Sequence, residues 1–217
     1  MRYSETVNAV FLSRPNRFIA FVNLEGVTTQ VHVKNTGRCR ELLIPGARVI
    51  LEKAKNGNRK TAYDLIAVYK DGMGWINIDS QAPNNVMHEW LLKQNYDLVK
   101  PEYSCGNSRF DFYMEKGDER YLMEVKGCTL EIDGKGYFPD APTLRGTRHL
   151  RELAFLVNQG YKCTAAFVIQ MEGIDEVIPN TGTDPEFAAA FFAAKEAGVE
   201  IRFFRCRVGE SELEIIE

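Results

Sequence analysis

The sequence has 217 residues, of which 45% are hydrophobic and 26% are charged. This composition supplies enough apolar material for a packed core and excludes a chain that is mainly disordered. No run of about 18 apolar residues occurs, so we expect no helix across a membrane and no membrane partner. Five scattered cysteines without a CxxC pair are typical of reduced thiols, which predicts a cytoplasmic location rather than a disulfide framework or a zinc site.

Charge is distributed unevenly along the chain. Residues 1–81 contain 12 Lys and Arg against 7 Asp and Glu, whereas residues 82–217 contain 15 against 23. We therefore expect two domains, a basic one at 1–81 and an acidic one at 82–217. A basic domain attracts a polyanion such as DNA. An acidic domain either gathers a metal ion or presents an ordinary solvated surface, and the charge pattern leaves both alternatives open.

Turn signals divide the first domain into short strands. Glu25-Gly26, Pro45-Gly46 and Asp71-Gly72 separate segments rich in β-branched and aromatic residues. Five short strands with a helical interruption before the third are typical of a small closed barrel of the OB type. The expected strands are 18–24, 28–33, 47–52, 63–69 and 75–79.

The pattern changes near Pro83, where a helix is expected to begin. Helices and strands then follow one another. In one of the expected helices, Asp184 is the cap and Pro185 is the first residue. This order predicts an α/β sandwich, so the fold class is α+β with two domains. The other expected elements are strands 109–114 and 121–126, a hairpin at 130–138, a helix at 142–159, and strands 164–170 and 199–208.

Charged side chains in two neighbouring strands carry the strongest chemical signal. Residues two apart in a strand face the same way, so Asp111 is expected to share a face with Arg109 and Tyr113, opposite Phe110 and Phe112.

In the next strand, Glu124 and Lys126 are expected to share a face, with Met123 and Val125 opposite. Asp111 and Glu124 can therefore converge. Two close carboxylates repel each other unless a cation lies between them, and a hard divalent ion such as Mg²⁺ or Mn²⁺ suits oxygen ligands. Lys126 would then neutralise charge on a phosphate during hydrolysis.

This arrangement resembles the PD-(D/E)xK nuclease superfamily, in which an Asp, a Glu and a Lys hold those positions. The resemblance implies that Asp111 and Glu124 bind the metal and that all three residues, with Lys126, are catalytic. The superfamily often adds a Glu on the preceding helix, and Glu89 matches this metal ligand by place and order. Phe110 stands before Asp111, where the superfamily often has Pro.

Longer blocks of the sequence carry a more specific resemblance. They are Val31-His32-Val33-Lys34-Asn35-Thr36-Gly37-Arg38, Glu41-Leu42-Leu43, Arg59-Lys60-Thr61-Ala62-Tyr63-Asp64-Leu65, Tyr103-Ser104-Cys105-Gly106-Asn107-Ser108-Arg109-Phe110-Asp111-Phe112, Phe138-Pro139-Asp140-Ala141-Pro142-Thr143 and His149-Leu150-Arg151-Glu152-Leu153. They resemble the bacterial and archaeal sugar fermentation stimulation protein A family over nearly the whole chain. The resemblance implies an OB-like domain, a nuclease-type domain, non-specific DNA binding and a role in regulating sugar (maltose) metabolism.

Two groups of basic residues are candidate DNA contacts. One group lies in a polar loop of the barrel, and the other lies at the start of the helix 142–159, beside the expected metal site. Arginine side chains in such places bind phosphate oxygens, whereas the alternative is an ordinary solvated surface. The candidates are Lys34, Arg38, Arg40, Arg145, Arg148 and His149.

These patterns favour a DNA-binding protein whose second domain contains a nuclease-like metal site. A Mg²⁺- or Mn²⁺-dependent phosphodiesterase that hydrolyses DNA is the alternative, and a scaffold with a vestigial site is a third. Motifs for nucleotide triphosphates, dinucleotides or serine hydrolases do not occur, so those classes have no support. The sequence leaves the oligomeric state open, including a homo-oligomer.

Overall fold

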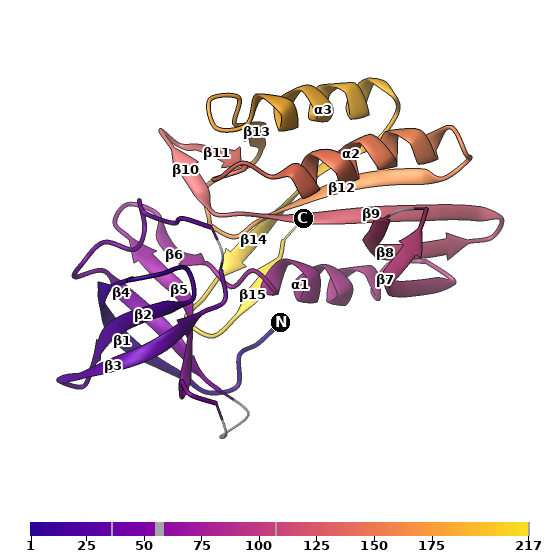
Figure 1. The fold of residues 1–217 in the computed structure, drawn as a ribbon. Helices are drawn as coiled ribbons and strands as arrows, with labels where there is room; N and C mark the ends of the chain where they lie inside the picture. Colours follow the sequence, from indigo (N-terminus) through magenta and orange to yellow (C-terminus); the bar gives the residue numbers. More distant parts are fainter. Residues whose placement is uncertain (36, 55–58, 107, 217) are drawn as a thin grey trace.

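The computed structural model describes residues 1–35, 37–54, 59–106 and 108–216, so Thr36 and Asn107 of the blocks quoted above lie outside the described residues. Figure 1 shows a small barrel, formed by the first part of the chain, beside a larger unit in which helices cover both faces of a sheet. The two-part α+β architecture expected from the sequence is confirmed.

Six strands form the N-terminal barrel sheet, in the order β3-β2-β1-β4-β5-β6. β3 also pairs in parallel with β5, with His32 opposite Asp64, and this pairing closes a barrel of the OB type. Alternate residues point into the barrel, where Phe11, Val22 and Leu65 are buried. The strands are β1 (Thr6–Ser13), β2 (Ile19–Leu24), β3 (Val27–Val33), β4 (Arg48–Lys53), β5 (Tyr63–Lys70) and β6 (Gly74–Asn77).

Strand β1 is an addition to the five strands expected from the sequence, which correspond to β2–β6. Its outward residues Val10 and Leu12 are apolar and 39% and 37% exposed, whereas Ala9 and Phe11 are buried. Both faces of β1 therefore carry apolar side chains. The strand lacks the alternation of polar and apolar residues by which a half-buried strand is recognised.

The second unit is a six-stranded sheet in the order β15-β14-β12-β9-β8-β7, with α1 on one face and α2 and α3 on the other (Figure 1). A small sheet, β10-β11-β13, lies beside it. Asp184 caps α3 and Pro185 is its first residue, as expected. The elements are α1 (Ala82–Leu91), β7 (Leu98–Cys105), β8 (Ser108–Lys116), β9 (Glu119–Cys128), β10 (Leu130–Ile132), β11 (Lys135–Phe138), α2 (Leu144–Val157), β12 (Lys162–Ile169), β13 (Val177–Pro179), α3 (Pro185–Glu196), β14 (Glu200–Val208) and β15 (Leu213–Ile215).

The two edge strands, β7 and β15, were not expected from the sequence. β7 contains Lys100, Pro101 and Glu102, and most of its residues are not buried, whereas β15 has only three residues. Proline and charged residues are tolerated at a sheet edge because one side of the strand has no hydrogen-bonding neighbour. Edge strands therefore resemble loops in sequence.

The alternation expected for 109–114 is wrong at Asp111. Phe110 belongs to the core cluster beneath α2, whereas Phe112 belongs to the cluster beneath α1. β8 pairs with β9 only from Phe112 onward, and Glu102, which lies across from Asp111 on β7, has a positive φ of 55°. An irregularity of this kind changes which way the neighbouring residues face. The regular strand is therefore interrupted at Asp111.

The five cysteines are free thiols, and four of them are buried. Burial raises the pKa of the Cys39, Cys128, Cys163 and Cys206 thiols to about 12, so they remain protonated and pack as small apolar groups. Within the described part of the chain, no helix has both the length and the apolar character needed to cross a membrane.

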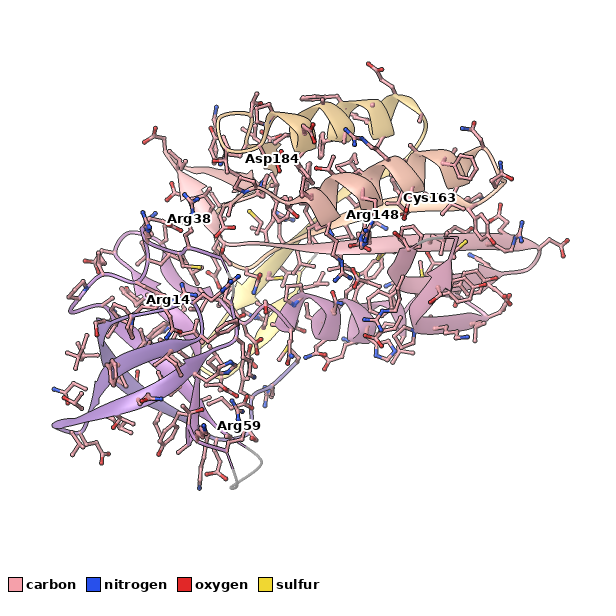
Figure 2. All side chains as sticks on the ribbon, in the orientation of Figure 1. Arg14, Arg38, Arg59, Arg148, Cys163 and Asp184 are labelled. Carbon is pink, nitrogen blue, oxygen red and sulfur yellow. The ribbon has the colours of Figure 1, made fainter. Side chains whose placement is uncertain are left out.

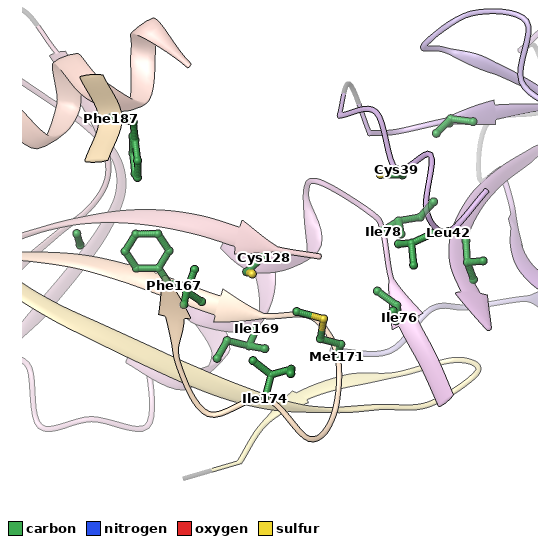
Figure 3. Packing of buried hydrophobic residues seen from close by; sticks show 14 of the residues in the cluster. Cys39, Leu42, Ile76, Ile78, Cys128, Phe167, Ile169, Met171, Ile174 and Phe187 are labelled. Atoms are coloured by element: carbon green, nitrogen blue, oxygen red, sulfur yellow. The ribbon is translucent and has the colours of Figure 1, made fainter. Parts of the chain in front are cut away.

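One apolar cluster joins the barrel to the second unit. Figure 3 shows Ile76 of the barrel near Met171, which lies just after β12. Ile78 of the barrel and Ile169, the last residue of β12, belong to the same cluster. Hydrogen bonds reinforce the contact, because Gln170 Nε2 donates to Asn77 Oδ1 at 2.9 Å and to the Asp79 carbonyl at 3.1 Å. The two units therefore share a buried interface and are not joined by a linker alone.

Replacing Gly127 with alanine tests the fit at this interface. A Cβ there would lie 2.3 Å from Gln170 Oε1 and 2.7 Å from Pro83 Cγ, and the hydrogen bonds of Gln170 restrain its side chain. We expect Gly127→Ala to lower the free energy of unfolding by about 1–3 kcal/mol, measured by urea denaturation. Gly182→Ala is the matched control, because the nearest atom to its added Cβ is 3.8 Å away. Equal stability of the two variants would contradict this account.

Candidate functional site

The site begins where β8 and β9 separate. Asp111 Oδ2 accepts a hydrogen bond from the Val125 amide at 2.8 Å, and Asp111 Oδ1 accepts one from Asn84 Nδ2 at 2.8 Å. The regular pairing of the two strands ends at Phe112 and Met123. The Asp111 side chain thus takes the place of a strand as the partner of the Val125 amide, and the gap between the strands opens beside Glu124.

Glu124 is the buried centre of the site. Its residue is only 3% exposed, and its Oε1 contacts both Lys126 Nζ and His149 Nδ1. Met123 and Val125 pack beneath α1, on the opposite face, which confirms the expected alternation in β9. Glu124 Oε2 is buried without a hydrogen-bond partner among the described residues.

The pKa values of the two carboxylates are shifted in opposite directions. Burial raises the pKa of Asp111, and the negative charge of Glu124 adds to this effect. Burial also opposes ionisation of Glu124, but the Lys126 ammonium and the His149 hydrogen bond outweigh it and lower the Glu124 pKa. Glu124 is therefore a carboxylate that the protein keeps ionised, and Asp111 is one that a nearby cation would help to ionise.

The side chains fit a divalent cation that retains several waters. Glu124 Oε2 is an acceptor that no donor of the described residues uses, and a cation satisfies such an atom. In the described ranges, no group of three or more His, Cys, Asp and Glu side chains is arranged to hold a metal. Asp111 and Glu124 are the two carboxylates of this site that could hold a cation, and Mg²⁺ commonly binds to one or two carboxylates together with water.

The expectation that Glu89 joins these carboxylates is wrong. Glu89 is 53% exposed in its side chain, and its carboxylate lies 2.8 Å from the Met1 amino group. The α1 residue that contacts Asp111 is Asn84, which lies in the first turn of the helix. Five residues correspond to about 500° of rotation, so Asn84 and Glu89 point from different sides of α1. The only sequence signal for Asn84 was its place beside the expected helix start.

The structure separates the six candidate DNA contacts into two classes. Arg38, Arg40, Arg145 and Arg148 are exposed, and none of them has an ion pair with a described residue. Lys34 and His149 are engaged within the protein.

The structure does not present Lys34 as the DNA contact that was expected, because carboxylates surround its ammonium group. Its Nζ lies 3.2 Å from Asp79, 3.4 Å from Glu52 and 3.5 Å from Asp64, and its side chain is 17% exposed. These three acids neutralise the ammonium group and would repel a phosphate. His149 is likewise not exposed for the DNA contact that was expected, because its side chain is 1% exposed and contacts Glu124 inside the site.

Arg14 holds the loop between β3 and β4 that carries Arg38 and Arg40, which we call the arginine loop. The Arg14 guanidinium donates to the carbonyl oxygens of Asn35 at 2.6 Å, Arg38 at 2.9 Å and Arg17 at 2.8 Å. The Arg38 amide donates to Asp140 Oδ2 at 2.9 Å, just before α2. Arg38 therefore lies where the barrel meets the second unit (Figure 2). Sequence reasoning missed Arg14, whose role depends on contacts across more than 20 residues.

The opposite pKa shifts predict opposite effects of neutralising each acid. A lowered pKa means that Glu124 stabilises the fold above its ordinary pKa of 4.5 and loses this contribution as the pH falls. A raised pKa means that Asp111 favours the fold at low pH and opposes it once the pH rises through the folded-state pKa.

At pH 7 we therefore expect Glu124→Gln to lower the free energy of unfolding by about 1–3 kcal/mol, because Lys126 and His149 lose a charged partner. We expect Asp111→Asn to raise it by about 0.5–2 kcal/mol, because the new oxygen still accepts from the Val125 amide and Asn84 can turn its amide so that its oxygen accepts from the new NH₂ group. Denaturant unfolding without divalent cations measures both, and the two effects should shrink as the pH falls toward 3. Stabilisation by Glu124→Gln would refute the assignment.

The chain matches known proteins along nearly its whole length. Residues 12–78 match the family described as "SfsA N-terminal OB domain", and residues 81–212 match "Sugar fermentation stimulation protein RE domain". A "Sugar fermentation stimulation protein homolog" from Ruminiclostridium cellulolyticum is 49% identical over 219 residues, which cover 99% of this chain and 96% of the relative. The homolog from Desulfitobacterium hafniense is 49% identical over 217 residues, which cover 99% of this chain and 95% of the relative.

A solved structure extends the comparison to the fold. The Pyrococcus furiosus SfsA structure, described as a complex with Ca²⁺, superposes with a TM-score of 0.87 at 29% identity. The match covers 100% of this chain and 94% of that chain. The chain belongs to the sugar fermentation stimulation protein (SfsA) family.

Proposed function

We propose that the protein binds DNA without sequence preference, through contacts to the phosphate backbone. The observation that carries the proposal is a set of four exposed arginines that have no ion pair among the described residues. Two lie in the barrel loop and two in the first turns of α2, and the bond from the Arg38 amide to Asp140 brings the loop to the start of α2. Backbone contacts of this kind carry no sequence information.

The location of the charges matters more than their total, because the protein has a net charge of -3. Three acidic side chains surround Lys34 of the barrel, so this part of the surface would repel a nucleic acid. DNA would instead contact the arginine side, beside Glu124. The relatives are named for sugar fermentation stimulation, and DNA binding would be the molecular activity through which this protein regulates sugar metabolism.

Removing one unpaired arginine should weaken DNA binding in a salt-dependent way. We expect Arg148→Ala and Arg38→Ala each to lower affinity for any duplex sequence and to reduce the slope of log affinity against log salt by about 1. Fluorescence anisotropy from 50 to 300 mM salt measures both quantities. Arg205→Ala is the control, because Arg205 pairs with Asp175 at 3.2 Å on β14. Absence of binding by the wild type at low salt would rule out the proposal.

Phosphodiester hydrolysis is the second candidate function, and the orphaned Glu124 Oε2 favours it. The Ca²⁺ in the Pyrococcus furiosus SfsA complex adds support for a cation in a relative of the same fold. Asp111 and Glu124 would hold Mg²⁺ or Mn²⁺. When bound, such a cation supplies an activated water and compensates negative charge on the phosphate.

The protein's own residues have separate roles in this proposal. Lys126 lies beside Glu124 and is 14% exposed in its side chain, so it can approach a phosphate from the open side. His149 fixes the Glu124 carboxylate by the contact at Oε1, which leaves Oε2 free. Asn84 and the Val125 amide orient Asp111. Exposed arginines of α2 would hold the neighbouring phosphates.

Cleavage of plasmid or oligonucleotide DNA with Mg²⁺ or Mn²⁺ tests hydrolysis. We expect Asp111→Ala and Lys126→Ala to lower the cleavage rate by about 100-fold or more, because each removes charge stabilisation at the reacting phosphate. Asp175→Ala is the matched control, since Asp175 is exposed on another part of the molecule. Equal cleavage by all four proteins would mean a contaminating nuclease, and no cleavage by the wild type with either ion would leave DNA binding alone.

A further inference from the structure

Two hollows that border the barrel differ in the charge of their lining. One, of about 590 Å³, is lined by Glu52, Asp64 and Asp79 around Lys34. The other, of about 470 Å³, lies between the end of β1, the β1–β2 loop and the connection from β3 to β4. We name it the arginine pocket, because its lining includes Arg14, Arg17, Arg38 and Arg40. Its charge favours an anion, and its volume lies in the range of about 300–1,000 Å³ that is usual for small-ligand sites.

The rim of the arginine pocket is both charged and fixed in place. Arg14 is held by backbone carbonyls from two loops, among them those of Gly37 at 3.0 Å and Arg17 at 2.8 Å. Asn16 Oδ1 accepts from the Phe18 and Ile19 amides at 2.9 and 3.0 Å, which shapes the opposite loop. A preformed rim loses little conformational entropy when it binds a ligand.

Three rim cations are free to bind an anion. Arg17, Arg38 and Arg40 are exposed and make no ion pair with a described residue. Arg17 lies over the Phe18 ring at 5.4 Å, which places an exposed aromatic surface beside the pocket. Guanidinium groups in this arrangement can bind phosphate oxygens in pairs.

The floor of the pocket is apolar, which a site for phosphate alone does not need. Phe11 and Leu43 are buried there, Leu12 is 37% exposed, and Pro45 completes the lining. An apolar floor beside a rim of arginines matches a ligand with an apolar ring and an attached phosphate. A purely inorganic anion would leave the floor unused, and an apolar ligand would leave the arginines unpaired.

We propose that the arginine pocket binds one nucleotide unit, with the nucleobase against the apolar floor and the phosphate on Arg17, Arg38 and Arg40. This inference rests on the proposed DNA binding and specifies its ligand as an unpaired nucleotide. A base inside a duplex is stacked and paired, so it cannot reach a floor of this kind without being extruded. The pocket therefore makes the protein prefer single strands or a free nucleotide to duplex DNA.

Three fluorescein-labelled probes test the inference with the full-length protein: a (dT)12 strand, an abasic strand of the same length, and a 12-bp duplex. The abasic strand keeps the phosphates but lacks the bases. We expect (dT)12 to bind about 5- to 100-fold more tightly than the abasic strand, which is the gain in affinity that base stacking gives in other proteins that bind single strands. Leu12→Asp should bring this ratio toward one, Arg17→Ala should weaken the binding of both strands because both keep the phosphates, and Arg205→Ala should leave the ratio unchanged. Both pocket residues are exposed, and circular dichroism verifies that the variants fold.

Each result has a distinct meaning. Equal affinity of the wild type for (dT)12 and the abasic strand overturns the inference, and the proposed DNA binding survives if the duplex still binds. Failure of all three probes to bind overturns both. Thymidine 5′-monophosphate added as competitor separates two sources of the same chemistry. Displacement that Arg17→Ala abolishes supports a free nucleotide in the pocket, whereas a base-dependent ratio without displacement supports a nucleotide within a strand.

Discussion

The burial of one ionised carboxylate organises the centre of this molecule. Glu124 is 3% exposed, and a charge so far from water is stable only with partners of opposite charge or with hydrogen-bond donors. Lys126 and His149 supply them at one oxygen, from the same strand and from α2. The second oxygen has no hydrogen-bond partner among the residues that the structure describes. The site is thus electrostatically incomplete, which explains why a cation is the natural addition to it.

The exposed arginines and the carboxylate site are held in place by the packing of the barrel on the second unit. A common apolar cluster and the Gln170 hydrogen bonds join the barrel to the sheet, and Asp140 receives the Arg38 amide. The exposed arginines and the acidic centre therefore belong to one packed arrangement. Binding and chemistry on a single nucleic acid would need no rearrangement of the two units.

The sequence predicted what depends on short-range periodicity and missed what depends on long-range contact. Alternation along β9 placed Glu124 and Lys126 together, and a cap and proline located the start of α3. The assignments of Lys34 and Glu89 failed because their partners, Asp79 and the Met1 amino group, are distant in sequence. β1 and the edge strands were missed because neither carries a one-sided apolar pattern. Local spacing defines a face but cannot reveal which charged group will cover it.

The close contact at Gly37 has a consequence for length. A Cβ there would lie 2.4 Å from Asp140 Oδ2, so the loop sits on the second unit with no space for a larger residue or an intervening layer. The distance between the arginine loop and the acidic centre is consequently fixed. A strand engaged at both places would be measured from its held nucleotide, and the protein rather than the base sequence would set where along the strand the acids meet a phosphate.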